Sequence, residues 1–285
     1  MFPVSDAHAH VSPAGLGGSL VGRKFREAGG WFIALVSLPP TNYGLRGDLN
    51  GLLKSFDIHA RECLKARSEG LSVACLAGVH PAYVDELVRA VGVNRVDEVL
   101  SMVRRALESL RRLRLEGLIE GFGEFGRPHY KTLPESVVVN DVVLREVLEV
   151  CSDTSSVLHL HTEQGGSATV ASVDALVKSA GASKCRVVFH HASLAVVRAA
   201  ENLGYHSTVL GREDLLLNIL ELNPSRVLVE SDFIDDPRRP GVVMYPWDLA
   251  GEVGKLLAKE GGHEEALGKC LVDNVRELYG VKPET

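Results

Sequence analysis

The sequence has few of the features that mark membrane proteins, secreted proteins or proteins that coat nucleic acid. Its 285 residues contain no apolar run of about 18 residues, the length at which a segment can cross a bilayer. The first ten residues, MFPVSDAHAH, lack the basic and apolar regions of a signal peptide. The formal net charge of −6 argues against a generally basic surface, although it leaves room for a local basic patch. We therefore expect a cytoplasmic protein with no membrane partner.

Cysteine is scarce and scattered. The five cysteines are odd in number and include no C-x-x-C pair; they are Cys63, Cys75, Cys151, Cys185 and Cys270. This usage predicts reduced, mostly buried thiols rather than a disulfide framework or a zinc knuckle.

What the sequence does contain is a regular alternation of short apolar runs and helical patterns. The length is near the upper size of one hydrophobic core and suits a (βα)8 barrel, which needs about 250 residues. The eight expected strands lie at 3–8, 31–38, 71–79, 117–123, 156–161, 186–191, 205–210 and 226–231. Helical periodicity is seen at 96–113, 137–151, 170–180, 194–204 and 212–222, with terminal helices at 247–261 and 264–280. Eight such units predict a parallel sheet closed into a TIM barrel, a single α/β domain over residues 1–285.

A barrel of this kind forms its active site from the C-terminal ends of several strands. Of the eleven histidines, seven lie at or beside an expected strand end: His8, His10, His80, His159, His161, His190 and His191. Glu124 follows the fourth expected strand and Asp232 follows the eighth. Because alternate residues of a strand share a face, Asp6, His8 and His10 are expected to converge.

Imidazole and carboxylate ligands without cysteine suit Zn²⁺, Mn²⁺, Fe²⁺ or Co²⁺ and leave Mg²⁺ possible. An H-x-H pair alone is a weak signal, but histidines at several independent strand ends are a stronger one. The two oxygens of Glu124 could bridge two ions about 3.5–4 Å apart. Asp232 could then serve as a ligand and as the base that accepts a proton from water.

These stretches together resemble the TatD family of metal-dependent hydrolases, a branch of the amidohydrolase-like barrels. The matching stretches are DAHAH at 6–10, GVHP at 78–81, GEFG at 123–126, HTE at 161–163, HHAS at 190–193 and ESD at 230–232. The resemblance implies one or two divalent ions (Zn, Mn or Mg) held by His8, His10, Glu124, His161, His191 and Asp232. It also implies hydrolysis of phosphodiesters, as by a deoxyribonuclease, with Asp232 and Glu124 as the catalytic residues.

Two choices among neighbouring histidines stay open. In a strand only one of His190 and His191 can point into the barrel; the HHAS pattern favours His191, with His190 as the alternative. His161 lies nearer its strand end than His159, so His161 is the better ligand. His80 lies near the expected mouth and could contact substrate.

The chain departs from the family pattern at two points. Where the family continues with leucine and aspartate, this chain reads GEFGRPHYK, which places Arg127, His129 and Lys131 after the fourth strand. With Arg238 and Arg239 after the eighth strand, these groups could hold phosphate oxygens, although Arg238 and Arg239 could instead pair with Asp235 and Asp236. We assign Arg127 and His129, with His80, to substrate binding.

The second departure is Glu163, which stands where the family often has arginine. It removes an expected phosphate contact and favours a rival function, hydrolysis of a lactone, amide or other non-phosphate ester. A metal-binding barrel without turnover is a further alternative. The expected partner is a small-molecule or nucleic-acid phosphodiester, and the oligomeric state is left open.

Overall fold

The computed structural model describes residues 2–259 and 263–283. Its strands are β1 Val4–His10, β2 Gly30–Val36, β3 Ser72–Ala77, β4 Gly121–Gly126, β5 Val157–His161, β6 Val187–Phe189, β7 His206–Leu210, β8 Val227–Glu230 and β9 Phe233–Ile234. The described strands form one parallel sheet in the order β8-β7-β6-β5-β4-β3-β2-β1-β9. Strands β1 to β8 therefore pair with their neighbours in sequence, as expected when helices connect parallel strands, and β9 pairs with β1.

The sheet closes on itself where its first and last strands meet. Ala9 and His10 of β1 pair with Phe233 and Ile234 of β9, and the Asp232 N–H donates to the His8 carbonyl at 3.0 Å. The curled sheet is an α/β barrel, which confirms the predicted fold class. The one difference is that the eighth expected strand divides into β8 and the short β9, with Asp232 between them.

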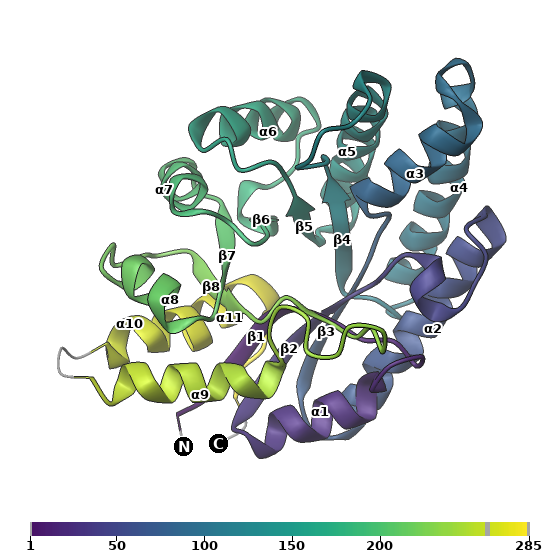
Figure 1. Ribbon diagram of the computed structural model, residues 1–285. Helices are drawn as coiled ribbons and strands as arrows, with labels where there is room; N and C mark the ends of the chain where they lie inside the picture. Colours follow the sequence, from purple (N-terminus) through teal and green to yellow (C-terminus); the bar gives the residue numbers. More distant parts are fainter. Residues whose placement is uncertain (1, 260–262, 284–285) are drawn as a thin grey trace.

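Helices surround the strands in chain order (Figure 1). They are α1 Gly17–Glu27, α2 Leu49–Ser68, α3 Pro81–Val91, α4 Val96–Leu115, α5 Pro134–Thr154, α6 Ser167–Ser179, α7 Leu194–Leu203, α8 Glu213–Leu220, α9 Pro246–Leu257, α10 Glu264–Gly268 and α11 Asn274–Tyr279. Helices α4 to α8 match the predicted ranges, whereas the sequence pattern did not single out α1, α2 or α3. The predicted helix at 264–280 is interrupted by a π-helical turn at Lys269–Asp273. Residues 260 and 261, the end of the predicted helix 247–261, lie outside the described residues.

Apolar side chains fill the half of the barrel interior that lies nearer the N-terminal ends of the strands. Small residues such as Ala7, Ala34 and Ala74 leave room for the Phe32 ring, which lies 4.8 Å from the ring of Tyr279 on α11. The C-terminal helix α11 therefore packs against the end of the barrel opposite the strand ends that carry the histidines. Above this layer the interior side chains become polar, beginning with His159 on β5.

The structure corrects the expectation that all the cysteines are reduced thiols. Cys63 on α2 and Cys75 on β3 form a disulfide, with their Cα atoms 5.8 Å apart. Cys151 and Cys270 are free and buried, as expected. The correction arises because α2 packs directly on β3, which brings together two residues separated by 12 positions. No helix in the described ranges is both long and apolar enough to cross a membrane.

Candidate metal centre

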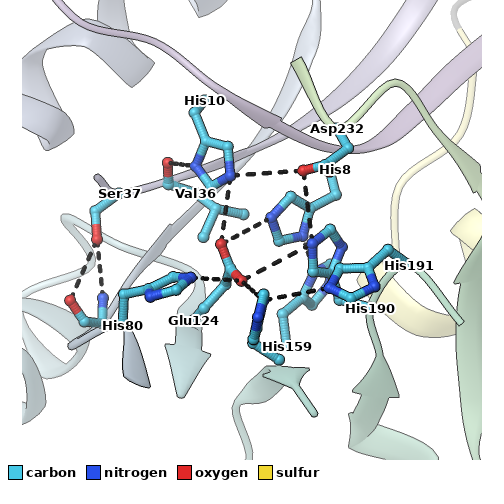
Figure 2. A network of polar contacts seen from close by, with 12 residues as sticks. His8, His10, Val36, Ser37, His80, Glu124, His159, His190, His191 and Asp232 are labelled. Atoms are coloured by element: carbon cyan, nitrogen blue, oxygen red, sulfur yellow. Dashed lines mark hydrogen bonds and ion pairs between the residues drawn. The ribbon is translucent and has the colours of Figure 1, made fainter. Parts of the chain in front are cut away.

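The carboxylate of Glu124 lies at the centre of a buried group of histidines (Figure 2). Its Oε1 atom is 3.4 Å from His8 Nε2 and 3.3 Å from His10 Nε2. Its Oε2 atom accepts a hydrogen bond from His161 Nδ1 at 2.8 Å, and lies 3.5 Å from His80 Nε2. The sequence placed Glu124 just beyond the fourth strand; the structure instead places it within β4, where the strand directs it into the barrel.

The strand β1 aims both of its histidines at this carboxylate. The Nδ1 atom of His10 donates to the Val36 carbonyl at 2.8 Å, which leaves Nε2 facing Glu124. The Nδ1 atoms of His8 and His159 share a hydrogen bond of 2.9 Å, and His159 Nε2 is 2.7 Å from the Tyr279 hydroxyl. A chain of hydrogen bonds therefore runs from α11 to His8 and fixes the side of the ring that faces the centre.

His190 and His191 both reach the centre, because β6 ends at Phe189 and the alternation expected of a strand does not apply to them. His190 Nε2 lies 3.8 Å from Glu124 Oε2 and 3.6 Å from Asp232 Oδ1. His191 has φ of 38° and turns back toward His161, with its Nε2 atom 3.3 Å from His161 Nδ1. The argument that only one of the two can face the barrel interior is therefore wrong, and the choice of ligand between them stays open.

Glu230 is a functional candidate that the sequence interpretation missed. Its side chain is fully buried at the end of β8; Oε2 is 2.8 Å from His190 Nδ1, and Oε1 accepts from the His191 N–H at 3.0 Å. One carboxylate thus positions both histidines. Burial and the nearby Asp232 charge raise the pKa of Glu230 well above its ordinary value. The available signal was a carboxylate inside the apolar run VLVES, where an unpaired charge would be costly.

Asp232 completes the centre from the turn between β8 and β9. Its Oδ1 atom lies 3.6 Å from His190 Nε2 and 3.9 Å from His10 Nε2. Burial raises the pKa of Asp232 to about 7, with the histidine His10 acting in the opposite direction and the Glu124 charge adding to the rise. A carboxyl group with that pKa can accept a proton near neutral pH.

Three of the histidines around Glu124, His8, His80 and His191, are held neutral, the state in which imidazole binds metal. Burial lowers the pKa values of His8, His80 and His191 to about 4. Burial raises the pKa of Glu124. The facing histidines lower it by more and hold it well below its ordinary value; they are His80, His190, His10 and His161. Burial acts on His10 in the same direction as on the other histidines, but the hydrogen bond and charge of Glu124 outweigh it and raise the pKa of His10. The centre therefore combines an anionic carboxylate with several uncharged nitrogen donors.

These donors fit a metal centre. His8 Nε2 is buried and has no hydrogen-bond partner in the described residues, an arrangement that is costly unless another group satisfies the nitrogen. At this centre, the groups with donor atoms within 4.8 Å of one another are His8, His10 and Asp232; His80, Glu124 and His161; His8, His190 and Glu230; and His129, His161 and His191. Nitrogen and oxygen donors of this kind bind several divalent ions, so the donor set does not select among Zn²⁺, Mn²⁺ and Mg²⁺.

The centre opens into a cavity of about 340 Å³ at the mouth of the barrel. His80 and His129, both predicted to contact substrate, lie in its wall together with Arg239. Arg127 lies elsewhere: its guanidinium donates to both carboxylate oxygens of Glu163, at 2.7 and 3.0 Å, and to Ser172 Oγ at 2.9 Å. The structure thus brings His80 and His129 to the mouth and holds Arg127 away from it.

The remaining basic residues of the loops are placed as follows. Arg238 donates to both oxygens of Asp236, at 2.9 Å each, and Arg239 contacts the same carboxylate at 3.4 Å. Asp235, the other expected partner, instead accepts from the N–H groups of Ser12, Leu16 and Gly17 and so fastens the loop after β1. Lys131 is exposed to solvent.

Fold and site together define a class, the amidohydrolase-like barrels with histidine and carboxylate donors at the C-terminal ends of the strands. The family model for TatD related DNase matches residues 5–280, and the chain belongs to this family. This confirms the resemblance drawn from the sequence motifs.

A known relative and solved structures also match nearly the whole chain. Uncharacterized protein MJ1127 of Methanocaldococcus jannaschii is 26% identical, over 99% of this chain and 98% of that protein. The TatD-like protein AF1765 of Archaeoglobus fulgidus matches with a TM-score of 0.65 and 16% identity, over 97% of this chain and 100% of that one. A mutant PTE-like lactonase of Deinococcus radiodurans matches with a TM-score of 0.66 and 16% identity, over 98% of this chain and 95% of that one. At these identities the two structures support the barrel fold.

Proposed function

We propose that the protein is a metal-dependent hydrolase that cleaves phosphodiesters, with Asp232 as the proton acceptor. The observation that carries the proposal is the position of Glu124 between two sets of donors. His8, His10 and Asp232 lie on the Oε1 side, and His161 binds Oε2 at 2.8 Å, so one carboxylate can serve two adjacent ions. The family description, TatD related DNase, supports the choice of phosphodiesters.

The side chains divide the work as follows. His8, His10, Glu124 and Asp232 would hold one ion, and Glu124, His161 and either His190 or His191 would hold the other. Divalent ions, when bound, lower the pKa of water and polarise the group to be cleaved. Asp232 faces the same space and accepts the proton that the attacking water loses, while His80 and His129 in the wall orient the substrate.

The proposal is tested with the purified protein, its metal content and a generic phosphodiester such as bis(4-nitrophenyl) phosphate. We expect one or two bound divalent ions, and turnover that is lost on chelation and restored by Zn²⁺ or Mn²⁺. Glu124→Gln should lower both metal content and turnover, because the amide replaces one of the two carboxylate oxygens. Protein that binds no ion after reloading would overturn the proposal, and protein that binds metal without hydrolysing any ester would favour a binding role.

A second candidate function is hydrolysis of a lactone or another non-phosphate ester. It is favoured by the engagement of Arg127 with Glu163, which leaves Arg239 as the one arginine or lysine in the described wall of the cavity. One of the matching structures is described as a PTE-like lactonase. Turnover of lactones without turnover of phosphodiesters, measured on the same preparation, would decide for this function.

We also propose that the protein is cytoplasmic, as expected from its sequence. The Cys63–Cys75 disulfide argues against it, since most disulfides form in oxidising compartments. Thiol labelling of protein taken directly from cells would separate the two cases: a reduced pair supports the cytoplasm, and an oxidised pair speaks against it.

A further inference from the structure

A second cavity, of about 250 Å³, lies beside the catalytic mouth. It is formed where β6 and β7 end, between the first turn of α7 and the helix α8. His191 belongs to the walls of both cavities. Because His191 Nε2 is 3.3 Å from His161 Nδ1, the second cavity begins next to the candidate metal ligands. We call this second cavity the side hollow.

The lining of the side hollow is mostly aliphatic. Val209 and Ile219 are almost fully buried in it, whereas Leu194 and Leu215 remain 36% and 41% exposed at its rim. When a ligand covers solvent-exposed apolar side chains at the edge of a concave site, the burial of their surface favours binding. No lysine, arginine, aspartate or glutamate lines the side hollow in the described residues, so it offers no lysine or arginine to a phosphate and no carboxylate to an ammonium group.

The amide side chains in the lining are already engaged with the backbone. The Gln164 amide accepts from the Ser193 N–H at 2.7 Å and donates to the Thr162 carbonyl at 3.2 Å. Asn218 Nδ2 donates to the Asp214 carbonyl at 2.9 Å. With the Gln164 amide and the Asn218 NH2 group engaged, and with no Phe, Tyr or Trp among the described lining residues, the side hollow suits an alkyl chain better than a nucleobase.

We propose that the side hollow binds an aliphatic substituent of the substrate while the scissile group lies in the catalytic cavity. The proposal rests on the hydrolase function above and specifies its substrate: an ester, in the first instance a phosphodiester, that carries one alkyl chain. At about 30 Å³ for each water-sized group, 250 Å³ holds on the order of eight such groups, which corresponds to a chain of roughly six to eight carbons. The alkyl chain of the substrate would pass beside His191, which borders both cavities.

The test is a series of alkyl 4-nitrophenyl phosphodiesters with methyl, butyl, hexyl and decyl groups and the same leaving group. We expect kcat/KM to rise about two- to fourfold for each added methylene and to level off beyond about eight carbons. Leu194→Gln and Leu215→Gln, both at the exposed rim, should reduce the gain from methyl to hexyl by about tenfold and leave the methyl ester unchanged. Leu115→Gln, at a position 64% exposed on the distant helix α4, is the matched control.

The outcomes separate this proposal from the proposed function. Hydrolysis of every ester at the same rate overturns the side hollow as a substrate site and leaves the hydrolase function standing. If no phosphodiester is cleaved, the same chain series is run with carboxylic 4-nitrophenyl esters, where a chain-length dependence removed by Leu215→Gln supports the side hollow. If neither series turns over, calorimetric binding of hexyl and methyl esters of methylphosphonic acid decides: tighter binding of the hexyl ester supports the proposal, and equal or absent binding overturns it.

Discussion

Arg127 and Glu163, the residues at which this chain departs most clearly from the TatD pattern, form a two-pronged ion pair, with N···O distances of 2.7 and 3.0 Å. The two departures therefore meet in space. The arginine after β4 and the glutamate after β5 neutralise each other outside the wall of the cavity, so the guanidinium is not available to a substrate phosphate.

Replacing Arg127 by methionine tests whether this pair is structural. The Arg127 side chain is mostly buried, but Glu163 is well exposed, so the pair is screened and we expect a loss of only about 1 kcal/mol in the free energy of unfolding. Because the guanidinium does not line the cavity, kcat/KM for a phosphodiester should change by less than about threefold. Urea denaturation and steady-state kinetics check both values. A tenfold rise in KM with unchanged stability would restore the substrate-binding role predicted from the sequence.

Glu230 is predicted to control metal binding through the two histidines that it positions. Glu230→Gln keeps the size of the side chain but replaces one of the two oxygens that face His190 and His191. Losing such a partner of a metal ligand typically weakens metal binding 10- to 100-fold. Titration against a chelating indicator measures this affinity, and Glu221→Gln, an exposed position on the end of α8, is the control. Equal affinities in the two variants would show that Glu230 has no positioning role.

Tyr279 is predicted to act on the centre from the opposite end of the barrel. Tyr279→Phe removes the hydroxyl that pairs with His159 Nε2 and leaves that buried nitrogen without a partner, at a cost of about 1–3 kcal/mol. Metal affinity should also fall, because His159 holds the Nδ1 atom of His8. Tyr130→Phe, at an exposed tyrosine, controls for loss of a hydroxyl. Unfolding curves and metal titrations that are the same for both variants would contradict the chain of hydrogen bonds.

His59 should make the protein less stable in mild acid. Burial lowers the pKa of His59 to about 4, from 6.5 in the unfolded chain. Between these pH values His59 is protonated in the unfolded state and neutral in the folded state. The contribution to stability is therefore complete above pH 6.5 and is lost as the pH falls toward 4; at pH 5 the loss is about 2 kcal/mol. In His59→Gln the fall in unfolding free energy between pH 7 and pH 5 should be smaller by that amount. Parallel pH profiles of the two proteins would contradict the assignment.

The sequence was most informative where a function depends on strand periodicity. His8 and His10 share a face of β1 because they are two residues apart, and their approach to Glu124 follows from the closure of the barrel. The prediction that only one of His190 and His191 faces the barrel interior was wrong, because it assumed that the strand extends to these residues, and β6 ends at Phe189. A boundary error of one or two residues is enough to change which side chains face the interior.

Contacts between distant segments could not be predicted in this way. The pairing of Arg127 with Glu163 and of Cys63 with Cys75 depends on how loops and helices pack, and no local pattern in the sequence encodes it. The contacts of Glu230 are of the same kind: its partners His190 and His191 lie in the turn after β6, and only the assembled barrel brings them to β8.

In the proposed function, Asp232 accepts the proton of the attacking water at a metal centre built around Glu124. The most direct measurement compares wild type and Asp232→Asn, both loaded with Zn²⁺ or Mn²⁺ and with metal content determined for each, in the hydrolysis of bis(4-nitrophenyl) phosphate between pH 5 and pH 9. We expect the variant still to bind metal through His8, His10, His161 and Glu124 but to lose about 10²- to 10⁴-fold in kcat, together with the acidic limb of the pH profile. An Asp232→Asn variant that retains wild-type turnover and the same pH profile would contradict this role of Asp232.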